Sequence, residues 1–283
     1  MKLRIATYNI HKGVSAFGRR TRIHDIKAAI DLLDADLVFL QEVQGQHDLH
    51  AAKHAHWPEQ SQHDFLAGES HHSAYGMNAI YEHGHHGNAL LSRFAISDFT
   101  NHDVSDHAYE QRGILHAVIG TPGADIHCFV IHLGLFAASR RRQVQALINQ
   151  IKHSLPADAP LIIAGDFNDW QNHLSASLYQ GLGVTEVFDN VIPTTGNSIF
   201  FSRKSSIQHG RTFPAGLPFL RLDRVYVRGF KIEKAQVMTG APWTKLSDHV
   251  PIVATLELIS VIAPESTKNS SLLLDLTSDK THA

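Results

Sequence analysis

Six apolar runs of this sequence begin or end at side chains that bind cations or move protons. These side chains are Asn9, Glu42, His132, Asp166 with Asn168, Asp223, and Asp248 with His249. Carboxylate and amide oxygens are hard ligands that suit Mg²⁺. A histidine held by an aspartate can position a proton beside a phosphoryl oxygen. Because strand ends present groups to a cleft from a rigid scaffold, we expect this set to meet in one site.

Taken one at a time, these residues have plainer structural explanations. The run Gly-Asp-Phe-Asn at 165–168 is typical of a turn. The run Ser-Asp-His at 247–249 is typical of a cap or a loop, and Asp223 has an arginine on either side for an ordinary ion pair. Their joint occurrence at the ends of apolar runs favours a functional site over these separate explanations.

The elements that must position these residues follow from hydrophobic periodicity. Apolar patterns predict strands at 3–9, 36–41, 77–81, 89–91, 114–119, 126–131, 161–164, 222–227, 232–237 and 251–258. Helical spacing predicts helices at 22–33, 139–153 and 174–179. The histidine-rich residues 45–75 show no such pattern and are expected to be irregular. Short, closely spaced strands between helices predict two sheets covered by helices.

Composition limits the classes of protein to which the chain can belong. It has 283 residues, of which 43% are hydrophobic, so a large core can be buried. The formal charge of −2 excludes a strongly basic protein that wraps nucleic acid. The 22 histidines would make any affinity for polyanions depend on pH. Cys128 is the one cysteine, so no disulfide framework holds the fold.

Targeting signals and domain boundaries are also readable at this level. We find no signal-peptide core and no apolar run near the length of a membrane-spanning helix, and we therefore expect a soluble, cytoplasmic protein without stable membrane insertion. One domain is expected over residues 1–258. The serine- and threonine-rich residues 259–283 are expected to form a flexible tail.

The motifs, taken together, resemble those of a known superfamily. They are TYNIHKG, LQEV, HHGNALLSR, EQRG, IHLGL, AGDFND, LRLDRVYV and LSDHVP. The series resembles the endonuclease/exonuclease/phosphatase superfamily, the deoxyribonuclease-I-like proteins, over about residues 3–258. It looks closest to small bacterial members without an assigned substrate. The resemblance implies an α/β fold, a four-layer α/β/β/α sandwich of two mixed β-sheets flanked by helices.

The resemblance also implies roles for individual residues. Metal binding, with Mg²⁺ as the expected ion and Mn²⁺ as the alternative, falls to Asn9, Glu42 and Asp248. Catalysis falls to His132, Asp166, Asn168, Asp223 and His249, and contacts to the substrate fall to Asn88 and Arg112. Whether Asp166 or His249 takes the proton of the attacking water stays open, as does the choice between one ion and two.

Three functions are compatible with these motifs. The first is a phosphodiesterase or nuclease acting on DNA or RNA, against which stands the lack of a basic stripe. The second is hydrolysis of a small phosphoester or a phospholipid headgroup, which suits the near-neutral charge. The third, an inactive scaffold or binding protein, fits least because every principal position holds the expected residue type. The sequence gives no indication of oligomeric state.

Other side chains near these motifs keep two readings. The arginines at 140–142 form either a solvated helix end or a rim that faces an anion. Trp57, Trp170, Trp243 and Phe213 pack in the core or at a rim, with base stacking as the alternative. The histidines at 71, 72, 83, 85 and 86 are read as solvated loop residues, because no cysteine accompanies them and their spacing fits no closed metal site, with a place at the cleft rim as the alternative for His85 and His86. The helical spacing of His47, His50 and His54 is typical of a hydrated helix face.

Overall fold

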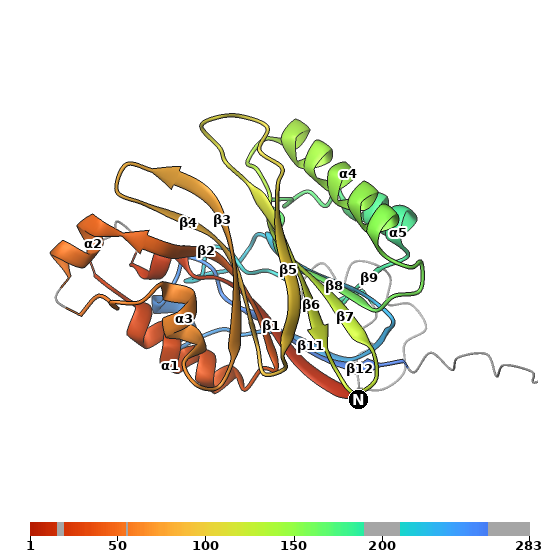
Figure 1. Ribbon diagram of the computed structural model, residues 1–283, viewed down its shortest axis with the longest axis horizontal. Helices are drawn as coiled ribbons and strands as arrows, with labels where there is room; N and C mark the ends of the chain where they lie inside the picture. The colour runs from red at the N-terminus through yellow and green to blue at the C-terminus, as the bar shows by residue number, and fades with distance from the viewer. Residues whose placement is uncertain (16–19, 55, 190–209, 260–283) are drawn as a thin grey trace, which may run out of the picture.

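Two β-sheets packed face to face form the centre of the molecule, with helices on both outer faces (Figure 1). The computed structural model describes residues 1–15, 20–54, 56–189 and 210–259. The expected tail, apart from its first residue, lies outside the described residues. None of the helices within those ranges is both long enough and apolar enough to cross a bilayer.

The first sheet has six strands. Their order is β11 (Phe230–Val237), β12 (Ile252–Leu258), β1 (Lys2–Asn9), β2 (Leu37–His47), β4 (Gly84–Ser92) and β3 (His72–Tyr81). The β1 and β2 strands are parallel, whereas β12 runs antiparallel to β1. A parallel pair beside antiparallel neighbours makes this a mixed sheet, as expected.

The second sheet repeats this arrangement. Its order is β5 (Ile96–Asp103), β6 (Gly113–Gly120), β7 (Asp125–His132), β8 (Leu161–Asp166), β10 (Asp223–Arg228) and β9 (Thr185–Glu186). Here β7 and β8 form the parallel pair, and β10 runs antiparallel to β8. Each sheet therefore carries one parallel pair next to an antiparallel strand.

Helices complete the four layers. The α-helices are α1 (Ile23–Leu33), α2 (Asp48–Lys53), α3 (Gln62–Ala67), α4 (Ala137–Ser154) and α5 (Ser175–Leu182), with short 3₁₀ turns η1 (His11–Gly13) and η3 (Trp243–Lys245). One apolar cluster fills the space between the sheets. A second joins the first sheet to α1 and α3, and a third joins the second sheet to α4 and α5. The predicted α/β/β/α sandwich is confirmed.

The structure differs from the sequence expectations where apolar periodicity is weak. Residues 45–75 are not irregular throughout, because they contain the end of β2, α2, α3 and the start of β3. Strand β5 was not predicted, since it lies at a sheet edge and most of its side chains are exposed or half-buried. An edge strand with a solvated face lacks the apolar run by which strands are recognised.

The topology brings the polar strand ends to one end of both sheets, the polar end. The parallel pairs β1 with β2 and β7 with β8 finish there, so Asn9 and Asp166 lie at the same edge. The antiparallel strand β10 begins there, and its Asp223 lies opposite Asp166 in the ladder. Residues at the starts of antiparallel strands thus join residues at the ends of parallel ones.

Candidate active site

Asp166, at the end of β8, is the centre of the polar cluster. Its Oδ2 lies 3.2 Å from Asn9 Nδ2, 3.6 Å from His132 Nε2 and 3.7 Å from His249 Nε2. The preceding Gly165 has φ +148°, and a Cβ there would lie 1.9 Å from the Ile131 carbonyl oxygen. Only glycine allows this close approach of β8 to β7, which sets Asp166 beside His132.

Burial decides the protonation of Asp166. Burial raises the pKa of its carboxyl to about 6, with the Asp223 charge acting in the same direction and the His249 charge against it. Its other oxygen, Oδ1, accepts a hydrogen bond of 2.9 Å from the Asn168 backbone N–H. The carboxylate is therefore fixed in orientation, and it takes up a proton more readily than an exposed aspartate.

Asp223 and His249 form a buried ion pair next to Asp166. The His249 Nδ1 donates to Asp223 Oδ2 at 2.8 Å, and Thr212 Oγ1 donates to the same oxygen at 2.5 Å. Burial alone would lower the pKa of His249, but the carboxylates of Asp223, Asp166 and Asp248 raise it to about 10. His249 is thus a cation near neutral pH, with its Nε2 turned to Asp166.

His132 and Asn168 lie on the opposite side of Asp166. Burial lowers the pKa of His132 well below its ordinary value, and the positive charges of Arg112 and His249 act in the same direction. Asn168, at φ +51°, donates its side-chain N–H to the Leu133 carbonyl oxygen at 2.9 Å. The site therefore pairs a neutral imidazole with a cationic one, which gives the two histidines different chemical roles.

Glu42 reaches the cluster through an irregularity in β2. The pairing of β2 with β4 shifts register between Leu40 and Val43, and Glu42 has φ +55°. A bulge of this kind re-aims a side chain. The Asn9 Nδ2 donates to Glu42 Oε1 at 3.3 Å as well as to Asp166. One amide thus connects the two carboxylates from the two sheets.

Asp248 lies at the margin of the cluster, where sequence reasoning missed two neighbours. His11 Nδ1 lies 3.3 Å from Asp248 Oδ1, and Lys12 Nζ lies 3.8 Å from Glu42 Oε2. The hydrogen bond to Asp248 raises the pKa of His11. Burial acts to raise the pKa of Asp248, but the hydrogen bond to His11 and the positive charges of His249 and His11 together lower it. Their signal was present in the motif TYNIHKG, in which His11 and Lys12 come two and three residues after Asn9.

Asn88 and Arg112 hold backbone rather than project into the cluster. Asn88 is buried in β4 and donates to the carbonyl oxygens of Gly113 and Val130, which joins the two sheets. Arg112 donates to the Leu133 carbonyl oxygen and to Glu110, each at 3.3 Å. Neither side chain is hydrogen-bonded to Asp166 within the described residues, so a substrate contact for them stays a prediction.

The oxygen donors of the cluster fit a hard divalent cation. Oxygens of Asp166 and Asp223 and a nitrogen of His249 lie within 4.8 Å of one another, and all three residues are buried. A protonated histidine is no ligand, however, and His249 already donates to Asp223. The carboxylate of Glu42, one-fifth exposed and joined to Asp166 through Asn9, is the more accessible hard donor.

The remaining sequence alternatives can now be placed. Arg140 is buried and donates to the Gly134 and Leu135 carbonyl oxygens, and Arg142 is paired with Asp106, so neither forms a free anion-facing rim. Trp243 packs in the core of the first sheet, whereas Trp170 is exposed two residues after Asn168. The Phe213 ring packs against His249 with centroids 5.0 Å apart.

His86 is one of the histidines that the sequence pattern predicts to be solvated loop residues. It lies in β4, and burial with the nearby charges of Lys12 and Arg112 lowers its pKa to about 4. His86 thus lies close enough to Glu42 and Lys12 for their charges to act on its pKa. The adjoining motif HHGNALLSR was the available signal for this position.

Comparison with known proteins agrees with this geometry. The sequence profile of the Endonuclease/Exonuclease/phosphatase family matches residues 6–249. The protein YbhP of Escherichia coli strain K12 is 38% identical over 261 residues, which cover 90% of this chain and 96% of YbhP. The matched range begins within β1 and ends at His249, so it includes every polar strand end described above.

Solved structures share the fold at lower sequence identity. D. rerio TDP2 in complex with a single-strand DNA product has a TM-score of 0.64 at 18% identity, covering 90% of this chain and 99% of TDP2. The mannosyl-6-phosphatase Bt3783 of Bacteroides thetaiotaomicron has a TM-score of 0.65 at 17% identity, covering 90% and 100%. The names of these two proteins point to different phosphoesters, so the shared architecture does not choose a substrate.

Proposed function

This chain belongs to the endonuclease/exonuclease/phosphatase family, and on that premise we propose that it is a divalent-metal-dependent phosphodiester hydrolase. One observation carries the proposal. Asp166 is joined through Asn9 to Glu42 and lies within 3.7 Å of the imidazoles of both His132 and His249. A carboxylate, a neutral imidazole and a cationic imidazole around one point are the groups that phosphoester hydrolysis requires.

Glu42 would hold the ion, with Asn9 beside it and Asp248 at the margin, and Mg²⁺ is the proposed ion with Mn²⁺ as the alternative. When bound, it supplies positive charge to the phosphoryl oxygens and fixes the ester in line with the nucleophile. The oxygen donors of these side chains are the ligand type that both ions prefer.

The chain's own groups carry out the proton and charge steps. Water attacks the phosphorus and a new P–O bond forms. The ester P–O bond breaks, and the leaving oxygen departs with the bonding electron pair and takes a proton from solvent. Asp166 takes the proton of the water, because His249 already carries one and cannot accept another. His249 holds its positive charge against a phosphoryl oxygen, and Asp223 with Thr212 fixes its ring. His132 and Asn168 position the ester from the other side.

Two substrate classes are retained. Nucleic acid is the first expectation, and the fold neighbour TDP2 was solved with a single-strand DNA product. A phospholipid headgroup is the second, and the exposed apolar side chains around the site, described in the next subsection, favour it. A cytoplasmic location stays a prediction from the sequence.

The proposal is tested with a substrate panel. We expect hydrolysis of bis-p-nitrophenyl phosphate with Mg²⁺, and we would add single-stranded and duplex DNA, RNA, phosphomonoesters and phospholipids. Glu42→Gln removes the accessible carboxylate charge and should lower turnover by about 100-fold or more. Glu69→Gln, at an exposed position after α3, is the matched control. A folded protein that hydrolyses no phosphoester with either ion would contradict the proposal.

A further inference from the structure

Large apolar side chains are exposed on the loops that surround the active-site cluster. We call the following six residues the apolar rim: Tyr109, Leu135, Phe136, Trp170, Leu217 and Phe219. Leu217 is 77% exposed, Tyr109 is 76% exposed and Leu135 is 66% exposed. The other exposed large hydrophobic residues among those described are spread over α1, α2, β3, β5 and the two ends of the described chain.

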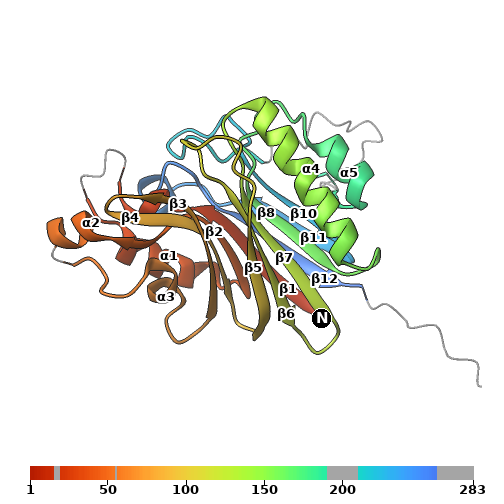
Figure 2. The ribbon, with the colours of Figure 1, turned by 45° about the horizontal axis from the view of Figure 1, so that its top comes forward.

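Three of the four rim segments are connected to a residue of the site. Leu135 and Phe136 follow His132, and Trp170 follows Asn168. Phe219 donates its backbone N–H to Phe213, whose ring packs on His249. Figure 2 shows the loop between β5 and β6, the start of α4 and the loop before β10 at the same end of the molecule.

The loop that carries Leu135 and Phe136 is held in place by hydrogen bonds. The Leu135 N–H donates to Glu110 Oε1 at 2.9 Å, and the Gly134 N–H donates to Gln143 Oε1 at 2.9 Å. Arg140 donates to the carbonyl oxygens of both residues from below. The apolar side chains are therefore presented on a fixed backbone, and their exposure is not the result of an untied loop tip.

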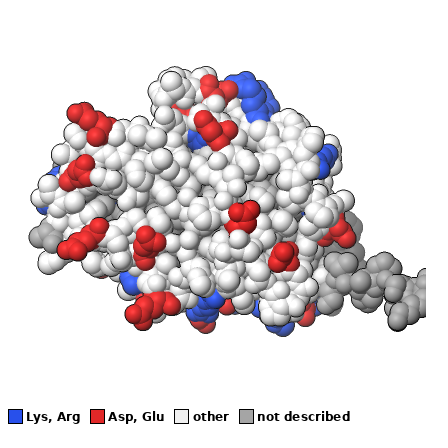
Figure 3. All heavy atoms as spheres, viewed as in Figure 1, with Lys and Arg blue, Asp and Glu red and all other residues white. Residues whose placement is uncertain are grey.

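Two arginines of the same loops are paired with acidic side chains. Arg112 pairs with Glu110 at 3.3 Å, and Arg142 pairs with Asp106. Asp106 also accepts a hydrogen bond from Ser139, which fixes the loop to the first turn of α4. On the face drawn in Figure 3, acidic and basic side chains lie interspersed and no continuous basic track is seen. Arg112 and Arg142 are thus bound to acidic partners, whereas the apolar side chains are exposed.

From this arrangement we infer that the apolar rim rests on a phospholipid surface and that the ester hydrolysed is in a phospholipid headgroup. The inference rests on the proposed phosphodiester hydrolysis. Two of the rim side chains are leucines, which cannot stack on bases and are stabilised only by entering an apolar phase. A peripheral contact of this kind needs no spanning helix. It places the polar headgroup next to His249 and Asn168 while the acyl chains stay in the lipid layer.

Nucleic acid is the competing occupant of the same surface. It would be bound by several unpaired lysines and arginines, with affinity that falls steeply as salt rises. Contact through an apolar rim predicts an affinity that changes little with salt, because burial of apolar area is not screened by salt. Salt dependence therefore separates the two occupants.

Binding is measured without turnover, with vesicles of dioleoylphosphatidylcholine and dioleoylphosphatidylethanolamine and with a fluorescent single-stranded oligonucleotide. We expect the wild type to float with the vesicles, with less than about a twofold change in partitioning from low to high salt. Trp170 should shift its emission to shorter wavelength on binding, and Trp170→Phe should abolish that shift.

Substitutions test the named residues. Leu135→Ser and Leu217→Ser should each weaken vesicle binding by about tenfold, while turnover of soluble bis-p-nitrophenyl phosphate stays within about twofold of wild type. Leu32→Ser, on α1 and 71% exposed, is the matched control and should change neither measurement. Both leucine positions are exposed, so we expect each variant to fold. The melting temperature of each variant checks this.

Three outcomes would overturn the inference. They are the absence of vesicle binding by the wild type, equal losses in Leu32→Ser and the rim variants, and salt-sensitive oligonucleotide binding that the rim variants weaken. Failure of the rim is distinguishable from failure of the proposed function. Hydrolysis of the soluble ester without vesicle binding would refute only the lipid contact of the apolar rim. Vesicle binding without hydrolysis of any phosphoester would refute only the proposed enzymatic function.

Discussion

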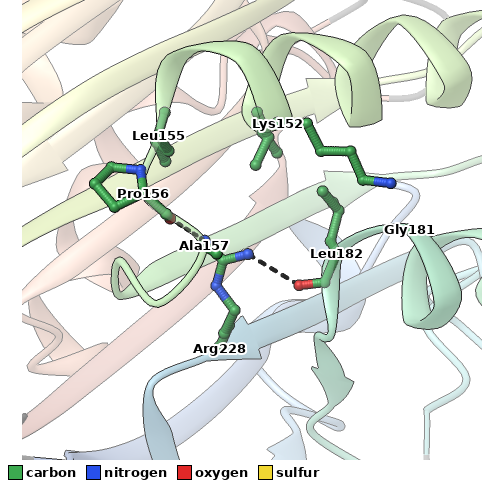
Figure 4. Close-up of a pocket in the computed structure, with 8 residues that line it drawn as sticks. Lys152, Leu155, Pro156, Ala157, Gly181, Leu182 and Arg228 are labelled. Atoms are coloured by element: carbon green, nitrogen blue, oxygen red, sulfur yellow. Dashed lines mark hydrogen bonds between the residues drawn. The ribbon is translucent and has the colours of Figure 1, made fainter.

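Strand β10 has charged side chains at both ends, and the two ends differ in the partners of those side chains. At its first residue, Asp223 faces His249 and Asp166, and these three residues direct their polar atoms at one another. At its last residue, Arg228 borders a cavity of about 340 Å³ between α4 and α5 (Figure 4). Its guanidinium donates to three backbone carbonyl oxygens, those of Ala159, Leu182 and Pro156.

The difference between the two ends lies in what the charged groups are committed to. Arg228 completes the hydrogen bonding of chain turns, so its charge is used to hold structure. At the polar end, Asp223 Oδ1 has no hydrogen-bond partner within the described structure, and the imidazoles of His132 and His249 share the carboxylate of Asp166. A cavity with an arginine is thus no indication of function, whereas uncommitted polar atoms in a buried cluster are.

Metal removal should produce the largest contrast between the two ends. Dialysis against EDTA should abolish turnover, because the positive charge held by Glu42 is lost, and Mg²⁺ or Mn²⁺ should restore it. The melting temperature should change by only a few degrees, since Arg228 and the apolar clusters do not depend on an ion. Undiminished turnover in excess EDTA would contradict the metal-dependent mechanism.

His249→Gln should give the next largest effect, and only on turnover. The amide retains a donor for Asp223 but carries no charge, so kcat should fall by about 100- to 1000-fold. Circular dichroism and the melting temperature report on whether the fold is kept. His72→Gln, at an exposed position of β3, is the matched control, and equal rates for the two variants would exclude His249 from the mechanism.

Arg228→Met should show the reverse pattern at the other end of β10. Three carbonyl oxygens lose their donor, which should lower the free energy of unfolding by about 2 kcal/mol and the melting temperature by about 5 °C. Turnover at a temperature where the variant is folded should stay at the wild-type value. Arg93→Met, which removes exposed ion pairs to Asp34 and Asp36, should cost much less. Loss of turnover in folded Arg228→Met would show that the two ends are not independent.

The smallest expected effect involves neither end of β10 and is seen in how the melting temperature depends on pH. Burial, together with the charge of His127, lowers the pKa of His116 in the middle of β6 to about 4. The unfolded chain binds a proton there below about 6.5 and the folded chain does not, so the free energy of unfolding falls as pH drops through this window. His116→Gln should remove about 2 °C of the acid-induced decrease in melting temperature. An identical pH profile for wild type and variant would refute the assignment.

Much of the fold was readable because its strands are apolar on at least one face. Strands such as β1, β7 and β8 are buried along most of their length, and the sequence marks them as apolar runs. Strand β5 escaped this rule because its side chains are mostly exposed at a sheet edge. Helices α2 and α3, of six residues each, are too short for a helical period to be recognised.

The sequence by itself determined which residue types lie at the strand ends. It placed Asn9, Asp166 and His132 at the end of an apolar run, and the ladder then requires such ends to meet when neighbouring strands are parallel. The family and its expected reaction followed from the same residues. That much is local chemistry, fixed by the order of side chains along the chain.

Tertiary structure alone decided how these groups act on one another. The cation at His249 and the neutral ring at His132 arise from burial and from carboxylates that come from distant segments. The contacts of His11 and Lys12, and the pairing of rim arginines while leucines face outward, likewise depend on distances between elements. The reason is physical: electrostatic and hydrophobic energies depend on spatial separation and exposure, which sequence order does not specify.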